Sequence, residues 1–267
     1  MPTIRSNGVE LSYTDTGSGP PVLLVSPAAS KAGIWDLHQV PALLAAGHRV
    51  ITFDSRGTAP SACPPGPYPL AELVADAAGL IRAVAGGPVR VVGASLGAMI
   101  GQELALAHPE LVASAVLLGT RARADHFRAA MTRASADRVR RPETGSAEHA
   151  AVAMMCQLFS PRTLADDRAA ADWLDVLTAF PTTGEGPALQ YEATLAGDRR
   201  EALGGVRRPV LVVAFSDDLV MPPALGKEVA DAIPGAKYAE VPGCGHFGFM
   251  ERPQVVNRIL VDFLSRT

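Results

Sequence analysis

Apolar and polar positions follow two different periods along the first half of the chain. Short, mainly apolar runs at 22–25, 49–53, 89–93 and 113–118 predict strands that are buried on both faces. Between them, apolar positions three or four residues apart predict helices at 34–46, 70–84 and 96–107. Strands that alternate with helices pair in parallel through right-handed crossovers. The pattern therefore predicts an α/β fold.

The second half departs from this alternation. Two late strands are expected at 209–215 and 238–241, with a closing helix at 253–265. At the start of the chain, Asn7-Gly8 predicts a hairpin turn before a strand at 9–15. Between 119 and 208 only helical patterns occur, at 123–140, 147–159, 164–180 and 187–203. Ordinary connections between strands are far shorter. We therefore expect a core domain of residues 1–119 and 208–267, interrupted by a helical lid at 120–207.

Two helical faces in the predicted lid are apolar, with side chains three or four residues apart. Such faces either contact the main domain or form the roof of an apolar pocket, and both uses are compatible. The positions are Val152, Met155, Cys156 and Phe159 in one helix, and Leu174, Leu177 and Phe180 in the next.

Composition excludes several function classes. The formal net charge is −3, with 24 basic and 27 acidic residues well mixed, so no basic stripe indicates a nucleic-acid or membrane partner. The three cysteines form no C-x-x-C pair, and we expect no metal, no cofactor and no disulfide framework. The N-terminus shows no apolar signal segment, and no apolar run reaches the ~18 residues that span a bilayer. We therefore expect a cytoplasmic protein.

One motif points to chemistry. Gly93-Ala94-Ser95-Leu96-Gly97 matches G-x-S-x-G and lies between a predicted strand and a predicted helix. A tight turn there would present the Ser95 hydroxyl at the carboxyl edge of the sheet, and its strain leaves no room for a Cβ at either glycine. The start of the helix also directs N–H dipoles toward developing negative charge. A glycine-flanked serine in an ordinary β–α turn would have the same pattern, so the prediction depends on partners for Ser95.

A serine hydroxyl becomes a nucleophile when a base, typically a histidine held by a carboxylate, removes its proton. Of the six histidines, only His246 follows the last predicted strand, in a glycine-flanked loop at the carboxyl edge. His126 and His149 fall in the predicted lid and are alternatives that would line the pocket. The carboxylate is expected in the loop after strand 209–215, where Asp217 and Asp218 compete.

The chain resembles the α/β-hydrolase superfamily over nearly its whole length. The resemblance implies an α/β-hydrolase fold: a mostly parallel eight-stranded sheet, helices on both faces and an inserted helical lid. It favours Asp218 as the acid, giving Ser95, Asp218 and His246 as catalytic residues in the family's chain order. The motifs are Asp54-x-Arg56-Gly57, Gly66-Pro67-Tyr68, the G-x-S-x-G turn, His108-Pro109-Glu110, Asp218-x-x-x-Pro222, and Gly245-His246-Phe247 followed by Glu251-x-Pro253.

One segment departs from the family pattern. The family usually has His-Gly after its third strand, and the next residue donates an oxyanion-hole N–H. Here the strand runs into Ser26-Pro27, and proline has no N–H. By register with the family, Ala28 supplies one donor and Leu96 the other. Ser26 and Ser30 either line the pocket or pack within the loop.

The expected activity is hydrolysis of a carboxylic ester, lactone or thioester of a hydrophobic small molecule through an acyl-Ser95 intermediate. The chain is most similar to bacterial lactonases, esterases and cofactor-free haloperoxidase-type hydrolases, including actinobacterial enzymes of secondary metabolism. Two alternatives stay open: non-hydrolytic use of the same three residues by a cyclase, lyase or perhydrolase, and a ligand-binding protein with slow turnover. A homodimer is one option for its assembly.

Overall fold

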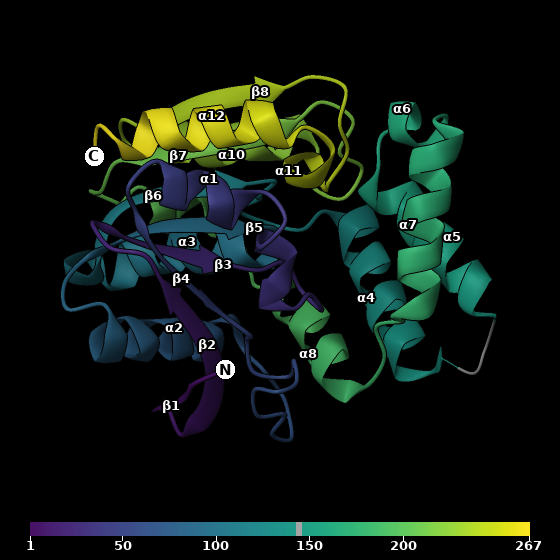
Figure 1. Cartoon of the computed structure of the whole chain (residues 1–267), viewed down its shortest axis with the longest axis horizontal. Coiled ribbons are helices and arrows are strands. Elements are labelled where there is room, and N and C mark those ends of the chain that lie inside the picture. The colour runs from purple at the N-terminus through teal and green to yellow at the C-terminus, as the bar shows by residue number, and fades with distance from the viewer. Residues whose placement is uncertain (143–145) are drawn as a thin grey trace.

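In the computed structural model, which describes residues 1–142 and 146–267, eight strands form one sheet (Figure 1). The strand order is β1-β2-β4-β3-β5-β6-β7-β8; β2 is antiparallel to both of its neighbours, and all other pairs are parallel. The prediction of a mostly parallel eight-stranded sheet is confirmed. The strands are β1 (Thr3–Ser6), β2 (Val9–Thr16), β3 (Pro21–Val25), β4 (Arg49–Phe53), β5 (Val89–Ala94), β6 (Val112–Leu118), β7 (Val210–Phe215) and β8 (Lys237–Val241).

Parallel pairing brings the carboxyl ends of the central strands to one edge of the sheet. Leu23 of β3 pairs in register with Ile51 of β4 on one side and with Val91 of β5 on the other. Strands β3, β5, β6 and β7 are rich in valine and leucine because helices cover both of their faces. The loops that follow β5, β6, β7 and β8 therefore meet at one edge, where open α/β sheets bind their ligands.

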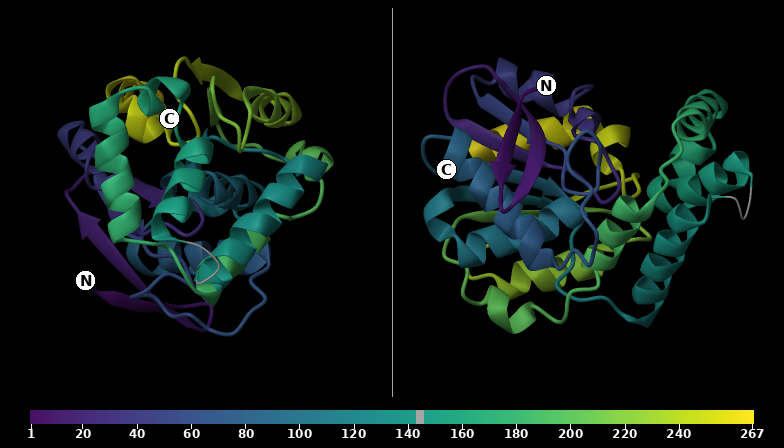
Figure 2. Two further views of the ribbon diagram at one scale, coloured as in Figure 1. Left: turned by 90° about the vertical axis from the view of Figure 1, so that its right-hand side faces the viewer. Right: turned by 90° about the horizontal axis from the view of Figure 1, so that it is seen from below.

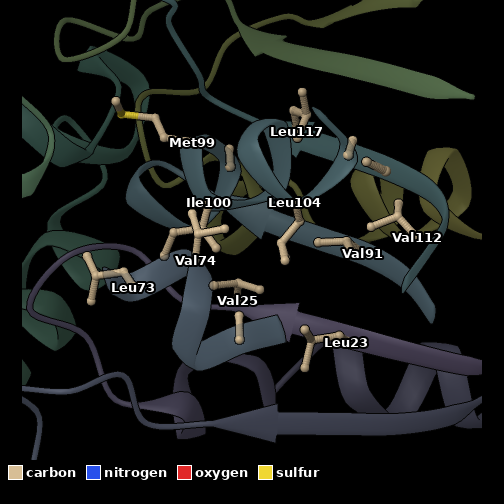
Figure 3. Close-up of a cluster of buried hydrophobic side chains, with 14 of the residues drawn as sticks. Leu23, Val25, Leu73, Val74, Val91, Met99, Ile100, Leu104, Val112 and Leu117 are labelled. Carbon is tan, nitrogen blue, oxygen red and sulfur yellow. The ribbon is translucent and has the colours of Figure 1, made fainter. Parts of the chain in front are cut away.

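Helices cover the sheet in two layers. On one face α2 (Leu70–Val84), α3 (Leu96–Ala107) and α10 (Pro223–Ala232) pack over the strands, and the side chains of α2 and α3 meet those of β3, β5 and β6 (Figure 3). On the other face lie α1 (Gln39–Ala45), α11 (Gly248–Glu251) and α12 (Pro253–Leu264). Burying each Leu, Ile or Val side chain contributes about 1.5–3 kcal/mol. Two short 3-10 helices, η1 (Ala32–Trp35) and η2 (Pro109–Leu111), lie before α1 and after α3.

A helical insertion lies between β6 and β7. Its helices α4 to α8 form a separate group beside the sheet, with α8 nearest to the core and α4 packed against α8 (Figures 1 and 2). Polar residues begin several of these helices; Asp125 Oδ1, for example, accepts the backbone N–H of Arg128 at 2.8 Å. The predicted insertion is thus present. Its elements are α4 (His126–Arg140), α5 (Ala147–Leu158), α6 (Pro161–Leu164), α7 (Asp167–Ala179) and α8 (Glu185–Ala193), followed by α9 (Arg200–Leu203).

Three of the predicted helices are divided in the structure. The helix expected at 34–46 becomes η1 and α1, because Pro41 lacks an N–H and fits only in the first turn of a helix. The helix expected at 164–180 becomes α6 and α7, since Asp166 caps a new start by accepting the N–H groups of Arg168 and Ala169 at 3.1 Å. The helix expected at 187–203 becomes α8 and α9.

The predicted apolar face of α5 is only partly correct. Met155 and Phe159 are buried, but Val152 and Cys156 are exposed. The face that lines the cavity described below instead carries Met154 and Leu158. None of the helices in the described ranges is long and apolar enough to cross a membrane.

Candidate active site

Ser95 is the single residue between β5 and α3, and its backbone is strained. Its φ is 56° and its ψ is −116°, a region that costs a non-glycine residue about 1–3 kcal/mol. The flanking glycines are sterically required: a Cβ on Gly93 would lie 2.1 Å from the carbonyl oxygen of Gly97, and a Cβ on Gly97 would lie 2.0 Å from that of Val25. The turn therefore fixes the Ser95 side chain at the carboxyl edge of the sheet.

His246 and Asp218 form a buried pair. The His246 Nδ1 and Asp218 Oδ2 atoms are 2.7 Å apart, and both side chains are shielded from solvent. A carboxylate only accepts hydrogen bonds, so the proton lies on Nδ1 and leaves Nε2 as a base. The other Asp218 oxygen, Oδ1, accepts the backbone N–H groups of Val220 and Met221, each at 2.8 Å. These contacts fix the orientation of the imidazole.

The neighbouring Asp217 has a different role. Its Oδ1 accepts the Ser216 hydroxyl at 2.9 Å, and its backbone N–H donates to the carbonyl of Cys244. The bond to Cys244 ties the loop after β7 to the loop after β8. The structure thus places Asp218, and not Asp217, against His246.

Gly119, just after β6, closes the space beside this pair. A Cβ on Gly119 would lie 3.2 Å from Asp218 Oδ2 and 3.4 Å from His246 Nδ1. The φ of Gly119 is 53°, in the left-handed region that favours glycine. The loops after β6, β7 and β8 therefore meet at the Asp218–His246 pair. The catalytic role of Ser95, Asp218 and His246 stays a prediction.

Ser95, His246 and Ala28 line one cavity of about 1120 Å³. It lies between the carboxyl edge of the sheet and the helical insertion, and it is large for a small-molecule site. The lid histidines, His126 and His149, are instead exposed. The apolar wall of the cavity includes Met131 of α4, Met154 and Leu158 of α5, Trp173 and Leu177 of α7, and Phe180 just after α7.

The two expected oxyanion donors, Leu96 and Ala28, lie in different backbone settings. Leu96 is the first residue of α3, so its N–H has no acceptor within the helix. Ala28 lines the cavity, and the next residue, Ala29, has a φ of 62° and donates its N–H to Gln190 Oε1 at 2.6 Å. Ser26 packs inward, where its hydroxyl accepts the Trp35 indole N–H at 3.1 Å.

Gln190, a residue of α8 that the sequence reading did not select, holds this segment. Besides accepting from Ala29, it donates through Nε2 to the carbonyl of Arg56 at 2.7 Å and to the hydroxyl of Thr58 at 2.9 Å. Gln190 is buried. One side chain of the insertion thus fixes two core loops at the cavity.

Glu251 joins the histidine loop (residues 243–247) to the insertion. Its Oε1 accepts the N–H of Gly245 at 2.6 Å. Its Oε2 accepts the N–H and the hydroxyl of Ser160, at 3.0 and 2.6 Å, and also the Thr163 hydroxyl. The carboxylate therefore gives the family motif Glu251-x-Pro253 a structural role.

Cys244 is close to the site but unsuited to be a nucleophile. It is fully buried, and burial raises the pKa of its thiol to about 12. Nucleophilic attack requires the thiolate, which is scarce at neutral pH when the pKa is so high.

Comparison with known proteins agrees with this architecture. A family model described as alpha/beta hydrolase fold matches residues 20–253. The chain belongs to the α/β-hydrolase family. The resemblance predicted from its motifs is thereby confirmed.

The relatives of this α/β-hydrolase are named for several different activities. It is 41% identical over 262 residues to BpoC of Mycobacterium tuberculosis, provisionally named a non-heme bromoperoxidase, covering 96% of this chain and 98% of that protein. The crystal structure of BpoC has a TM-score of 0.91, with 40% identity over 96% of each chain. RutD of Azorhizobium caulinodans, provisionally named a carbamate hydrolase, is 34% identical over 265 residues, which is 98% of each protein.

A third relative is the enol-lactonase from Burkholderia xenovorans LB400, whose crystal structure has a TM-score of 0.86 and 30% identity. The alignment covers 99% of this α/β-hydrolase and all of that chain. The two crystal structures thus share this fold over nearly the whole chain.

Proposed function

We propose that this α/β-hydrolase cleaves a carboxylic ester, lactone or thioester of a hydrophobic small molecule through an acyl-Ser95 intermediate. One observation carries the proposal: the strained Ser95 and the buried Asp218–His246 pair open onto the same cavity, whose wall is largely apolar. The similarity to an enol-lactonase supports a lactone among the substrates.

In the first half-reaction, Ser95 Oγ attacks the carbonyl carbon while its proton moves to His246 Nε2. Asp218 stabilises the imidazolium through Nδ1. The N–H groups of Leu96 and Ala28 would stabilise the negative charge on the carbonyl oxygen. The bond to the leaving oxygen or sulfur then breaks, and the leaving group takes the proton from His246, which leaves an acyl-Ser95 ester.

In the second half-reaction, water attacks the acyl carbon. His246 accepts one proton of that water and returns it to Ser95 Oγ as the acyl bond breaks. The products are a carboxylic acid and an alcohol or thiol, and the enzyme returns to its starting state. The helical insertion supports a hydrophobic substrate because its side chains supply much of the apolar wall of the cavity.

The test is hydrolysis of p-nitrophenyl butyrate by the wild type, by Ser95→Ala, and by Ser265→Ala, which removes an exposed hydroxyl on the surface. We expect Ser95→Ala to lose kcat by on the order of 10⁶-fold, to the background rate, because the nucleophile is gone. Ser265→Ala should match the wild type. Equal rates for wild type and Ser95→Ala would refute the proposal, and release of a single equivalent of nitrophenol would indicate a slow-turnover binding protein.

A second candidate is perhydrolysis, in which hydrogen peroxide replaces water and converts acyl-Ser95 to a peracid. The similarity to BpoC, provisionally named a non-heme bromoperoxidase, favours it. The same assay with p-nitrophenyl acetate and added peroxide separates the two, because a perhydrolase yields peracid in proportion to nitrophenol. Carboxylic acid as the only product would exclude this candidate.

A further inference from the structure

Arg121 is a buried cation in the wall of the cavity. It follows the carboxyl end of β6 by three residues, and only 1% of it is exposed to solvent. Two residues earlier, Gly119 lies against the Asp218–His246 pair. The segment that carries Arg121 therefore passes directly beside the proposed catalytic residues, and Arg121 lines the same cavity as Ser95.

The guanidinium has fewer partners than a buried arginine needs. Its hydrogen bonds all run from Nη2: to the carbonyl and the hydroxyl of Thr194, both at 3.1 Å, and to the Thr132 hydroxyl at 3.5 Å. These acceptors are neutral, and the buried Nε has no hydrogen-bond partner among residues 1–142 and 146–267. Within the part of the chain that the structure describes, no carboxylate forms an ion pair with Arg121.

The nearest acidic side chains are already engaged. Asp125 bonds the N–H of Arg128 at 2.8 Å and its Nη1 at 3.2 Å. Asp218 uses both oxygens for His246 and the loop after β7. Burial lowers the pKa of Arg121 to about 10, which still leaves the guanidinium charged at neutral pH. A buried charge without an anionic partner is costly, so the free protein holds a cation that a ligand can neutralise.

Most of the other charged side chains on the described wall are cations as well. Arg128 and Arg138 also line the cavity, and each already has a protein partner: Asp125 for Arg128 and the Tyr191 side chain for Arg138. Lys31 lines the cavity as well, but unlike the buried Arg121 it is exposed to solvent. Among the described residues of the wall, Glu185 is the acidic one, and it is paired with Arg140 at 2.7 Å. The cavity is therefore apolar with a cationic side.

We propose that Arg121 binds a carboxylate on the substrate, distinct from the acyl group that Ser95 attacks. The proposal rests on the proposed hydrolase function and specifies its substrate class: hydrophobic esters or lactones that also carry a carboxylate. A guanidinium fork matches a carboxylate in shape and charge. The single positive charge of Arg121 and the single negative charge of a carboxylate cancel when the two groups pair.

A purely structural role makes a different prediction. Arg121 bonds Thr132 of α4 and Thr194 at the end of α8, so its loss could simply loosen the insertion. That would slow all substrates alike. A carboxylate-binding role slows anionic substrates selectively, and this difference is measurable as a ratio.

The experiment compares p-nitrophenyl half-esters of dicarboxylic acids, from succinate to suberate, with neutral p-nitrophenyl esters of matching acyl length. In the wild type, the ratio of kcat/KM for the anionic ester to that for the neutral ester should exceed ten for at least one length. In Arg121→Met this ratio should fall roughly tenfold to hundredfold, mainly through KM, as for loss of a hydrogen bond to a charged group. Arg121→Lys should retain part of the ratio because it keeps the charge.

The matched control is Arg123→Met, two residues along, which removes a partly buried arginine paired with Glu228 at 2.9 Å. Its ratio should equal that of the wild type. A wild-type ratio near one at every length, or an Arg121→Met ratio equal to that of the wild type, would overturn the proposal while leaving the hydrolase function intact.

A binding measurement keeps the proposal testable if none of these esters is cleaved. Trp173 lines the cavity, whereas the chain's other tryptophan, Trp35, is buried in the core, so tryptophan fluorescence reports occupancy. At constant ionic strength, the same dicarboxylates should bind Ser95→Ala more tightly than diols of equal length. That preference should vanish in the double variant Ser95→Ala, Arg121→Met. Equal binding of diacids and diols by Ser95→Ala would refute the carboxylate-binding role of Arg121.

Discussion

At the residue scale, Asp217 and Asp218 show how adjacent identical side chains acquire different roles. Asp218 bonds His246 and two backbone N–H groups, whereas Asp217 bonds the Ser216 hydroxyl within its own loop. Only the first arrangement can fix the tautomer of an imidazole. The difference arises because the backbone after β7 turns the Asp218 side chain toward His246 and the Asp217 side chain toward Ser216.

Replacing each aspartate by asparagine tests this assignment. Asp218→Asn should lower kcat by on the order of 10⁴-fold, because the amide no longer holds the proton on His246 Nδ1. Asp217→Asn should change kcat by no more than a few-fold, since its side chain bonds the Ser216 hydroxyl and not the imidazole. Both variants are compared as purified proteins on p-nitrophenyl butyrate, and losses of similar size would contradict the assignment.

Sequence could locate some of these residues and not others. Ser95 and His246 lie in glycine-rich turns whose local geometry places them at the ends of strands, so a few neighbouring residues suffice to predict them. Arg121 and Gln190 gave no such signal. Arg121 becomes a buried cation only when α4 and the end of α8, which lies 73 residues further along the chain, close over it. Gln190 acts through loops more than a hundred residues away.

At the scale of elements, the strands were predicted better than the helices. Strand positions follow from short apolar runs, whereas the ends of a helix depend on single residues such as Pro41 and Asp166, which divided two predicted helices. Helix α10 was not predicted, although Pro223 at its start and Leu225 and Val229 four residues apart fit its pattern. The contacts that hold one element to another could not be predicted from the sequence either, because each is made by a single polar side chain.

Glu251 makes such a contact, between the histidine loop and the junction of α5 and α6. Glu251→Gln retains one oxygen and turns an NH₂ group toward donors from Gly245, Ser160 or Thr163. We expect a loss of stability of about 1–3 kcal/mol, together with a lower kcat because His246 loses its support.

Thermal unfolding and ester hydrolysis measure the two effects of Glu251→Gln. Glu240→Gln is the control, since Glu240 is exposed and bonds only the Tyr238 hydroxyl at 3.0 Å. If Glu251→Gln behaved like that control, the insertion would not be held to the histidine loop by this carboxylate.

At the scale of the whole molecule, the sequence indicated a core and an insertion, but not how tightly they are joined. The domain boundary at 120–207 remains a prediction. The predicted insertion contacts the core at two places, because α8 bonds core loops through Gln190 and α9 packs against α10. The number of strands came from the family resemblance, since β8 has few buried positions of its own. Strand order is a property of the assembled sheet that no local pattern encodes.

One buried ion pair connects several of these parts. The Arg56 guanidinium contacts both oxygens of Asp76 at 2.6 Å, and the two side chains are only 7% and 2% exposed. Asp76 belongs to α2, and its carbonyl accepts the Ser6 hydroxyl of β1 at 2.8 Å. The carbonyl of Arg56 accepts from Gln190 of α8. The pair thus lies where the N-terminal hairpin, a core helix and the insertion meet.

A double-mutant cycle tests whether this pair holds the molecule together. Arg56→Met should lower the free energy of unfolding by about 3–5 kcal/mol, because it leaves Asp76 as an uncompensated buried charge. Asp76→Leu should cost less, since Arg56 keeps an ion pair with Glu72 at 3.3 Å. The double variant buries no charge at this position, so its loss should be well below the sum of the two single losses. Urea denaturation followed by circular dichroism gives all four free energies, provided that the slope with denaturant stays constant. Additive losses would mean that the two side chains stabilise the fold independently, and that the three parts meeting at this point are held by other contacts.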